Sequence, residues 1–501
     1  MILNRKDYRS KVLGCWMGKN IGGTLGAPFE WRRQINDVAF YTQDLQGEPL
    51  PNDDLDIQLL WLIALEEQGI KIDAHVLGEY FLLYVTPHWA EYGMAKINMR
   101  SGLQPPLSGM HNNPYKHSCG AFIRSEIWAC IAPGCPAVAA KYAYEDAIID
   151  HGDGEGTFAE VFCAAMGSAA FGETDLRKLI EIGLSYIPAD CGVTGAVRHA
   201  IASYDASKGW REARDALLDE YRGGLRIHQV SEDDQHKGFA GGQRGWDVPS
   251  NIGIIVLGLL YGQGDFDKTV CTTVNCGEDT DCTGATVGSL FGIMHGIEAI
   301  PEKWITPIGR KLNPACLNLG ELGYFGDQLP ATVDELTDRT ERIAQQVILR
   351  HRLPVTIAEA QATDLSGMTD AALFAPQGLS WNLGQVVFRF DFFEAAVDYD
   401  GDPLIRDGEP KAIELTIRNA YKVMENLNLH WHLPDGWRVR PSADAKVFVP
   451  NAFLGAPETI ISFELETDAV TRPSNRCAVE LSVEGRPTLM LVPVVLLNGN
   501  V

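Results

Sequence analysis

Two segments carry glycine at every fourth position, and this pattern constrains the fold more than any other feature of the chain. The glycines are Gly14, Gly18, Gly22 and Gly26 in the first segment and Gly284, Gly288, Gly292 and Gly296 in the second. Glycines four positions apart form a ridge along one face of a helix. Each glycine inside a helix lowers helix stability by about 0.8–1 kcal/mol relative to alanine, so such a ridge is retained where two backbones must approach closely. We therefore predict two central helices, packed against each other in the simplest arrangement. An alternative is that Gly22 and Gly23 end the first helix and begin a loop.

The spacing of apolar residues divides the chain into a helical part and a strand-rich part. Up to about residue 350 the apolar residues recur at helical spacing, and 333–349 is the last such segment. After about residue 355 the period changes to two, with turn signals such as Asp407-Gly408 between the runs. We predict an all-α domain over residues 1–350, a linker over 351–375, and a smaller antiparallel β-sandwich over 376–501.

Composition narrows the class of protein and of partner. The chain has 501 residues, 46% hydrophobic and 22% charged, which is typical of a globular protein of two or three domains. A net charge of −24 argues against nucleic acid and anionic membrane surfaces as partners. The N-terminus lacks the apolar stretch of a signal peptide, and no later run is long enough to span a bilayer. The eleven cysteines show no metal-binding spacing with histidine, so we expect reduced thiols and a cytoplasmic location.

Two short acidic clusters, Asn52-Asp53-Asp54 and Glu278-Asp279-Thr280-Asp281, each precede an apolar helical run. Four aspartates facing one cavity would repel one another unless a hard cation lay between them, and oxygen donors of this kind suit Mg²⁺, Mn²⁺ or Ca²⁺. The alternative is that these residues are ordinary helix caps. Because a cap needs one oxygen, the doubling of the acid within each cluster favours the metal site.

Four segments in the helical part match the motifs of a known family. They lie in the family's order over roughly residues 8–350 and are Gly22–Glu30, Asn52–Asp54, Cys119–Arg124 and Gly277–Ala285. On these segments the chain resembles the ADP-ribosylglycohydrolase family. The last segment, with the glycine ridge that follows it, is the most specific match.

The resemblance implies an all-α orthogonal helical bundle with one or two Mg²⁺ or Mn²⁺ ions at the mouth of a cleft, Ca²⁺ being a further candidate. The ions would hold the ribose hydroxyls and the water that attacks the anomeric carbon, while carboxylates stabilise the oxocarbenium-like transition state. Carried over residue by residue, Asp54, Asp281 and Glu30 are the catalytic candidates. The candidate metal ligands are Asn52, Asp53, Asp54, Asp279, Asp281 and Thr283.

The chain departs from the family pattern beside the expected ribose position. Cys282 replaces a threonine ligand, and sulfur is a poor ligand for Mg²⁺, whereas the Thr283 hydroxyl lies one residue further on. Gly23 replaces an aspartate. We expect a metal-dependent hydrolase of a ribosyl-type glycosidic bond acting on a ribosyl or ADP-ribosyl small molecule or conjugate. A hydrolase of a small glycoside or nucleoside is the alternative, and a non-catalytic ADP-ribose or sugar binder is the competing class.

Other residues are weaker candidates for binding the substrate. Asp150 and His151 lie in an acidic, glycine-rich segment that could face the cleft, or could be a solvated loop between helices. Gly120 belongs to the third matching segment. Trp246 follows a glycine-rich stretch and could stack on a base or sugar, although an ordinary packing role is the simpler interpretation. We expect the β-domain either to bind sugars or to build a homo-oligomer.

Overall fold

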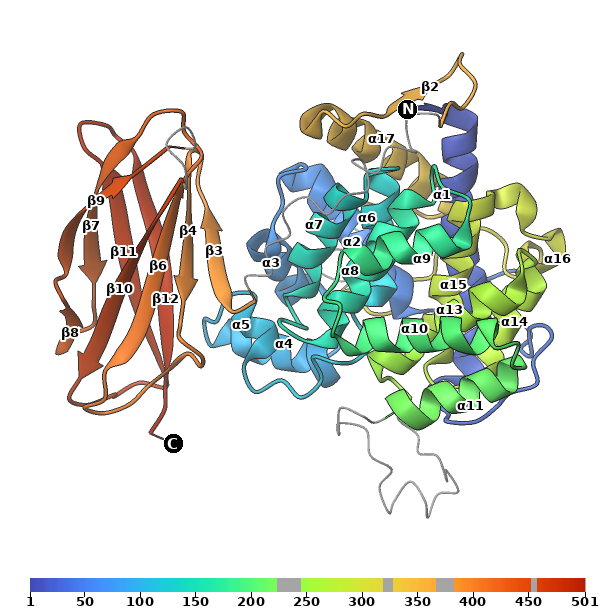
Figure 1. Cartoon of the computed structure of the whole chain (residues 1–501), viewed down its shortest axis with the longest axis horizontal. Helices are drawn as coiled ribbons and strands as arrows, with labels where there is room; N and C mark the ends of the chain where they lie inside the picture. Colours follow the sequence, from blue (N-terminus) through green and yellow to red (C-terminus); the bar gives the residue numbers. More distant parts are fainter. Residues whose placement is uncertain (223–244, 319–327, 366–382, 452–456, 501) are drawn as a thin grey trace. The chain divides into compact units, whose positions relative to one another are not determined.

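The chain folds as two units, the first built from helices and the second mainly from strands (Figure 1). Unit 1 comprises residues 1–93 and 114–380, and unit 2 comprises residues 94–113 and 381–501. The computed structural model describes residues 1–222, 245–318, 328–365, 383–451 and 457–500. The predicted fold class, a helical part followed by a smaller and mostly antiparallel β part, is confirmed.

The helices follow one another along the chain from the N-terminus to residue 351. In unit 1 they are α1 Arg5–Gly26, η1 Ala27–Phe29, α2 Asp53–Gln68, α3 Ala74–Tyr84, η2 Phe122–Arg124, α6 Glu126–Ile131, α7 Pro136–Ala147, α8 Glu155–Ala169, α9 Leu176–Ser185, α10 Gly192–Asp205, α11 Trp210–Tyr221, α13 Val248–Gly262, α14 Phe266–Asn275, α15 Thr280–His295, η3 Ile297–Ala299, α16 Glu302–Ile305 and α17 Val333–His351. Helix α4 (Ala90–Arg100) crosses into unit 2, which also contains α5 (Leu107–Met110). Among the described residues, no helix combines the length and apolar character that crossing a membrane requires.

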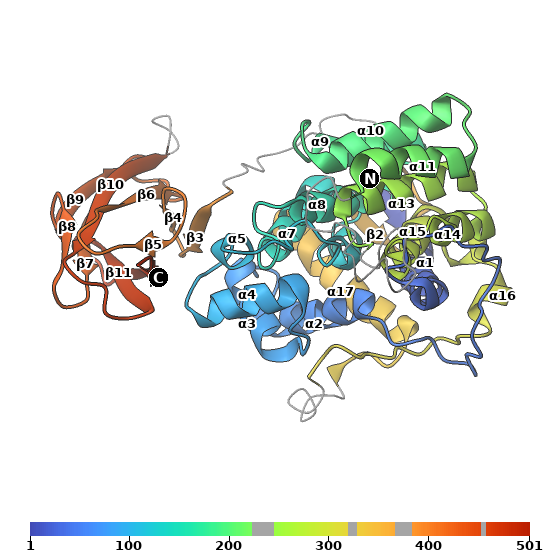
Figure 2. The ribbon, with the colours of Figure 1, turned by 90° about the horizontal axis from the view of Figure 1, so that it is seen from below.

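Helices α1 and α15 pack directly backbone to backbone, along a contact that we call the glycine seam (Figure 1, Figure 2). The seam pairs the four glycines of α1 with Gly292, Gly288, Gly284 and Thr280 of α15, in that order. A Cβ added at Gly18 would lie 2.1 Å from the carbonyl oxygen of Gly288. The predicted packing of the two glycine ridges is therefore confirmed. The alternative end of the first helix at Gly22-Gly23 is wrong, because α1 continues to Gly26.

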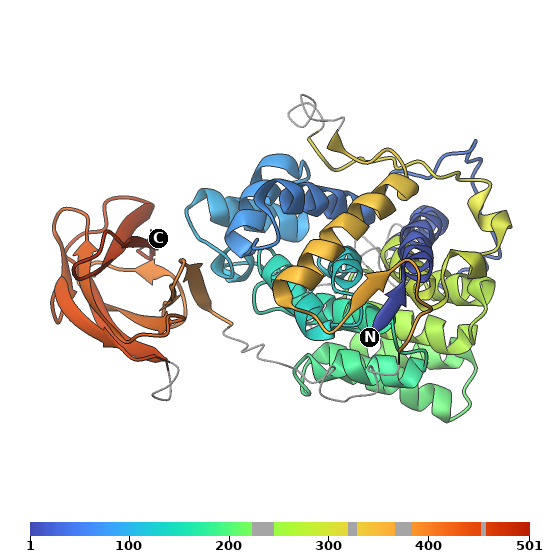
Figure 3. The same cartoon turned by 90° about the horizontal axis from the view of Figure 1, so that it is seen from above.

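The N-terminal end of α1 is anchored to the last helix and to a short strand pair. Arg5 Nε donates to Glu341 Oε1 of α17 at 2.5 Å, and Arg9 donates to the other oxygen at 2.7 Å. Strand β1 (Ile2–Asn4) pairs in parallel with β2 (Thr356–Ala358), which follows α17. In Figure 3 the gold helix α17 lies beside the dark-blue α1 near the N-terminus. These contacts fix α1 at the end opposite to the candidate site.

Unit 2 contains two five-stranded sheets that share one apolar core, and Figure 2 shows them as two layers. The strand orders are β3-β4-β6-β10-β8 and β5-β12-β11-β7-β9, and all pairs are antiparallel except β12 with β5. The bounds are β3 Gln385–Arg389, β4 Phe393–Asp398, β5 Leu404–Ile405, β6 Lys411–Asn419, β7 Glu425–His432, β8 Trp437–Arg440, β9 Asp444–Val449, β10 Glu458–Thr467, β11 Ser474–Val483 and β12 Leu489–Asn498. Both sheets contribute to the core, as a β-sandwich requires.

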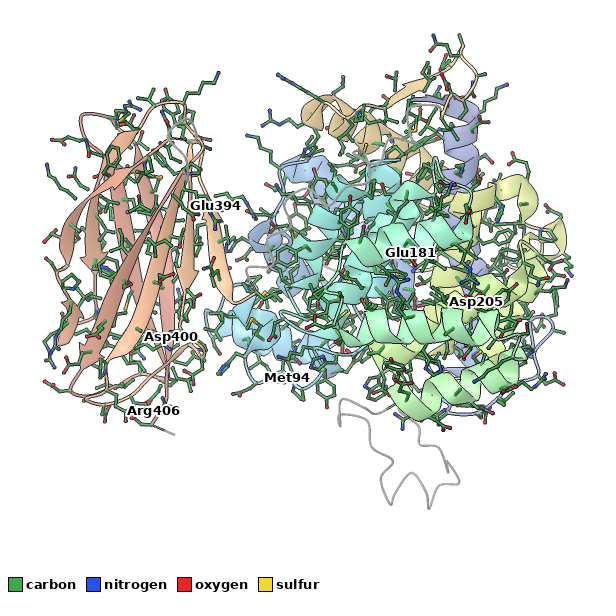
Figure 4. The ribbon with its side chains drawn as sticks, in the orientation of Figure 1. Met94, Glu181, Asp205, Glu394, Asp400 and Arg406 are labelled. Carbon is green, nitrogen blue, oxygen red and sulfur yellow. The ribbon has the colours of Figure 1, made fainter. Side chains whose placement is uncertain are left out.

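The core of unit 2 also contains two residues from the early part of the chain. Leu103 and Leu107 are buried among the strand residues, and Ser474 Oγ donates to the carbonyl oxygen of Ser101 at 2.6 Å. Met94, labelled in Figure 4, is the residue at which this segment begins. Unit 2 is therefore assembled from two separate stretches of sequence.

Several charged side chains of both units, among them Glu181, Asp205 and Glu394, form ion pairs (Figure 4). In unit 1, Glu181 of α9 pairs with Arg198 of α10, and Arg177 of α9 pairs with Asp205 of α10. In unit 2, Glu394 lies 2.6 Å from Arg418. Solvent-exposed pairs of this kind contribute about 0–1 kcal/mol each. These ion pairs therefore contribute little to the stability of each unit compared with apolar burial.

We predict that Gly18→Ala lowers the free energy of unfolding by about 3 kcal/mol or more, because the new methyl group would overlap the backbone of α15. The gain in helix propensity, about 1 kcal/mol, is too small to offset this overlap. Gly209→Ala is the control, since an added Cβ there meets no atom within 4 Å, and it should change stability by less than about 1 kcal/mol. Urea unfolding of both variants measures the difference. Equal stability of the two variants would contradict the seam.

Candidate metal centre

The glycine seam ends at the place where the two acidic clusters meet. At its last step, Thr280 Oγ1 donates to the carbonyl oxygen of Gly26 at 2.8 Å, and a Cβ on Gly26 would lie 2.1 Å from the Thr280 carbonyl oxygen. Asp279 and Asp281 flank Thr280 at the start of α15, and Glu30 follows η1 at the end of α1. The close helix packing therefore brings these three carboxylates together.

Among the described residues, potential ligand atoms form two overlapping sets, each with all atoms within 4.8 Å of one another. The first set is Glu30, Asp279 and Asp281, and the second is Asp54, Asp281 and Cys282. Oxygen ligands lie about 2.0–2.6 Å from a hard divalent cation, so two ligands of one ion are at most about 5 Å apart. Both sets satisfy this limit. The clusters at residues 52–54 and 278–281 thus converge, as the sequence predicts.

Several oxygens of the buried carboxylates at this centre accept no hydrogen bond from the described residues. Asp54 is 1% exposed, and neither of its oxygens accepts a hydrogen bond. One buried oxygen of Asp279 and one of Asp281 also accept no hydrogen bond. Lys19 Nζ lies 3.8 Å from Asp54 Oδ1 but is closer, at 2.9 Å, to Glu126 Oε1. Buried polar groups without partners are costly and rare. The residues present therefore fit a divalent cation, which would satisfy these oxygens.

Mutual repulsion makes the centre difficult to ionise without a cation. Burial and then the neighbouring carboxylates Asp281 and Glu30 raise the pKa of Asp279 well above its ordinary value. Burial, followed by the charges of Asp53 and Asp54, raises the pKa of Glu30 to about 8. Burial also raises the pKa of Asp54, although Lys19 opposes this effect. Proteins resolve such clusters either by keeping carboxyls protonated or by binding a cation.

The other predicted ligands lie beside the centre, and their roles as ligands stay predictions. Asn52 caps α2, since its Oδ1 accepts a hydrogen bond from the Asp54 backbone nitrogen at 2.9 Å. Asp53 is half-buried, and its charge raises the pKa of both Glu30 and Asp281. Thr283 Oγ1 donates to the Asp279 carbonyl oxygen at 2.9 Å and therefore stabilises the first turn of α15.

Asp150, His151 and Gly120 surround a buried arginine. Arg124 donates to both oxygens of Asp150, at 2.7 and 2.9 Å, and to the Gly120 carbonyl oxygen at 2.9 Å. His151 Nδ1 lies 2.8 Å from Asp150 Oδ1, and the side chains of Asp150 and His151 are fully buried. In this structure these residues anchor the segment around η2. Their role in substrate binding stays a prediction.

Trp246 packs with a second tryptophan that follows Glu30 directly. The rings of Trp246 and Trp31 meet edge to face with centroids 5.3 Å apart. Trp31 is 42% exposed and has a φ of 61°, which is unusual for a bulky residue. Because strained backbone is often retained at functional positions, this pair is a candidate surface for an aromatic part of a ligand. Of Gly241–Asp247, the glycine-rich stretch before Trp246, residues 241–244 lie outside the described residues.

Sequence reasoning assigned no site role to three residues that lie at or beside the centre. Lys19 lies in α1 between Gly18 and Gly22 and is buried. A lysine within a glycine-rich helix is the sequence signal that could have identified it. Glu278 is fully buried at a positive φ of 68° and pairs with Arg222 and with Arg33, the latter at 3.6 Å. Cys282 is predicted to be a poor Mg²⁺ ligand, and its sulfur lies within 4.8 Å of an oxygen of Asp54 and of Asp281.

The fold and the site define a protein whose helical unit contains a cluster of buried carboxylates. Residues 4–346 match the model of the ADP-ribosylglycohydrolase family, and the chain belongs to this family. The family is one of glycosyl hydrolases, so the chain is related to enzymes of ADP-ribosyl hydrolysis.

Two solved structures show limited similarity to the chain. A solved structure described as an ADP-ribosylglycohydrolase-related protein complex is 18% identical, covers 68% of this chain and 99% of its own, and has a TM-score of 0.45. A FixG-related protein from Vibrio parahaemolyticus is 10% identical, covers 22% of this chain and 99% of its own, and has a TM-score of 0.18. No curated protein matched the chain.

We predict that the metal-free protein loses stability as the pH rises from about 4.5 to about 8. In the unfolded chain Glu30 ionises near 4.5, whereas in the fold its pKa is about 8, so the folded state binds the extra proton throughout this window. Glu30→Gln should reduce the slope by up to about 1.4 kcal/mol per pH unit. Thermal melts with and without Mn²⁺ measure the effect, and the exposed Glu302→Gln is the control. A slope unchanged by Glu30→Gln would contradict the burial of this charge.

Proposed function

We propose that the chain is a divalent-metal-dependent hydrolase of a ribosyl-type glycosidic bond, with ADP-ribosyl conjugates as its substrate class. Membership in the ADP-ribosylglycohydrolase family supports the reaction class. The observation that carries the metal dependence is the convergence of Asp54, Asp279 and Asp281 as buried carboxylates with oxygens that accept no hydrogen bond. A Mg²⁺ or Mn²⁺ ion held by these residues would supply positive charge for the ribose hydroxyls and for the attacking water.

Glu30 is suited to move the proton that hydrolysis transfers. Water adds to the anomeric carbon, the bond to the acceptor breaks, and a proton passes from the water to the departing group. Glu30 is half-buried next to Asp279 and Asp281, so it lies on the accessible side of the carboxylates that a cation would bind. A carboxylate so placed can accept a proton from the attacking water and release it to the departing group. The neighbouring negative charges also favour the oxocarbenium-like transition state.

Burial indicates from which side the substrate approaches. Asp54, Asp279 and Asp281 are each at most 4% exposed, whereas Asn52, Asp53 and Glu30 are only half-buried. The accessible side is thus formed by the ends of η1 and of the segment that leads into α2. Trp31 lies directly after Glu30 and offers an exposed aromatic ring on which a nucleobase can stack.

Asp281→Asn is predicted to lower kcat by at least about 100-fold, since this residue belongs to both ligand sets. Its thermal midpoint in metal-free buffer should stay unchanged or rise, because one repulsion is removed. Asp56→Asn is the matched control: Asp56 is also a buried aspartate, but its Oδ2 accepts hydrogen bonds from the backbone nitrogens of Ala315 and Cys316. Release of ADP-ribose from a modified protein and hydrolysis of small ribosides are both measured.

The outcomes separate the candidate functions. Hydrolysis of ribosides but not of the protein conjugate would favour the small-glycoside alternative, which the departures at Gly23 and Cys282 suggest. Binding of ADP-ribose without any hydrolysis would favour the non-catalytic binder. If Asp281→Asn is as active as the parent, Asp281 is not in the working centre.

Trp31→Ala is predicted to raise KM for nucleotide-bearing substrates about 5- to 100-fold with little change in kcat, because base stacking contributes about 1–3 kcal/mol. A riboside without a nucleobase serves as the control substrate, and its KM should not change. Steady-state kinetics with both substrates measure the split. An equal rise of KM for both substrates would argue against stacking on Trp31.

A further inference from the structure

The second ligand set, Asp54, Asp281 and Cys282, contains a sulfur atom, and sulfur ligands favour different cations from oxygen ligands. We propose that Asp54, Asp281 and Cys282 form a mixed oxygen–sulfur site that selects a sulfur-favouring divalent cation such as Zn²⁺ or Co²⁺. The set of Glu30, Asp279 and Asp281 contains only oxygen donors and suits Mg²⁺ or Mn²⁺. The inference rests on the metal centre of the proposed function, but metal binding tests it without any hydrolytic assay.

Two independent observations support the mixed site. The Cys282 sulfur and one oxygen each of Asp54 and Asp281 lie within 4.8 Å of one another, and zinc–sulfur and zinc–oxygen bonds of about 2.3 and 2.1 Å allow up to about 4.4 Å across one ion. Modest side-chain adjustment therefore completes the site. Separately, Asp54 is 1% exposed and neither of its oxygens accepts a hydrogen bond. A cation bound there would satisfy both oxygens of that carboxylate.

The surroundings of Cys282 differ from those of a packing cysteine. Cys282 is 7% exposed in the first turn of α15, and its sulfur lies beside carboxylate oxygens of Asp54 and Asp281. Cys119, a second buried cysteine near the same centre, donates to the Trp246 carbonyl oxygen at 3.2 Å, and its sulfur belongs to neither ligand set. Coordination by Cys282 would release the thiol proton to solvent and form a metal–thiolate bond, with no change of oxidation state.

The test is Co²⁺ titration of the full-length, metal-stripped protein under reducing conditions. A thiolate–cobalt bond gives a charge-transfer band in the near ultraviolet, and the band should saturate at one Co²⁺ per chain. In Cys282→Ser the band should be lost, and Zn²⁺ affinity should fall at least about tenfold while Mn²⁺ affinity changes little. Cys282→Thr should shift the preference further toward Mn²⁺. Cys119→Ser is the matched control and should keep the band.

Several results would overturn the proposal. A band that survives in Cys282→Ser, a band lost in Cys119→Ser, or Co²⁺ binding without any band would each exclude Cys282 as the ligand. Circular dichroism of the metal-free variants separates loss of the site from loss of the fold. The two proposals also fail differently: hydrolysis supported by Mg²⁺ without a cobalt band refutes only the mixed site, whereas a cobalt band in a chain that hydrolyses nothing refutes only the enzymatic function.

Discussion

Backbone contact between α1 and α15 is the constraint on which the candidate site depends. Helices with ordinary side chains between them pack about 8–10 Å apart. Side chains on these ridges would prevent Thr280 from bonding to the Gly26 carbonyl oxygen, and the carboxylates of Asp279 and Asp281 would move away from Glu30. The loss of helix propensity at each glycine is therefore offset by a geometry that no other residue allows.

Two groups of buried charges in unit 1 illustrate the difference between structural and ligand-binding residues. Arg124 donates hydrogen bonds to Asp146 and Asp150 at 2.7–2.9 Å, so both carboxylates have a charged donor within the protein. Among the described residues, Asp54 forms one ion pair, with Lys19 at 3.8 Å, and Lys19 lies closer to Glu126, at 2.9 Å. Removing a partner from a satisfied buried pair is costly, whereas an unsatisfied carboxylate gains when a cation binds. A buried aspartate that accepts hydrogen bonds from a charged donor therefore has a structural role, whereas one without such donors is suited to bind a cation.

Features with a local sequence signal could be predicted, and features that depend on tertiary contacts could not. The glycine ridges, the acidic clusters and the alternation of strands such as β6, where Ile413, Leu415 and Ile417 are buried, follow from spacing alone. The exposure of Trp31 and the position of the Cys282 sulfur depend on segments far apart in the sequence. Asn52 shows a third case, because one amide can cap a helix and also face a ligand, and spacing cannot separate the two roles.

Because residues 94–113 belong to unit 2, this unit cannot be completed until the C-terminal strands have been synthesised. The β unit is closed by a segment that is synthesised before most of the helices, and the bond between Ser474 and Ser101 spans 373 positions in the sequence. Contacts of such separation form late in folding, because a long loop must close first. During synthesis Leu103 and Leu107 therefore stay without their apolar partners until the last strands emerge. The two units cannot be divided by one cut, and the C-terminal region is not a module that can be removed or exchanged independently.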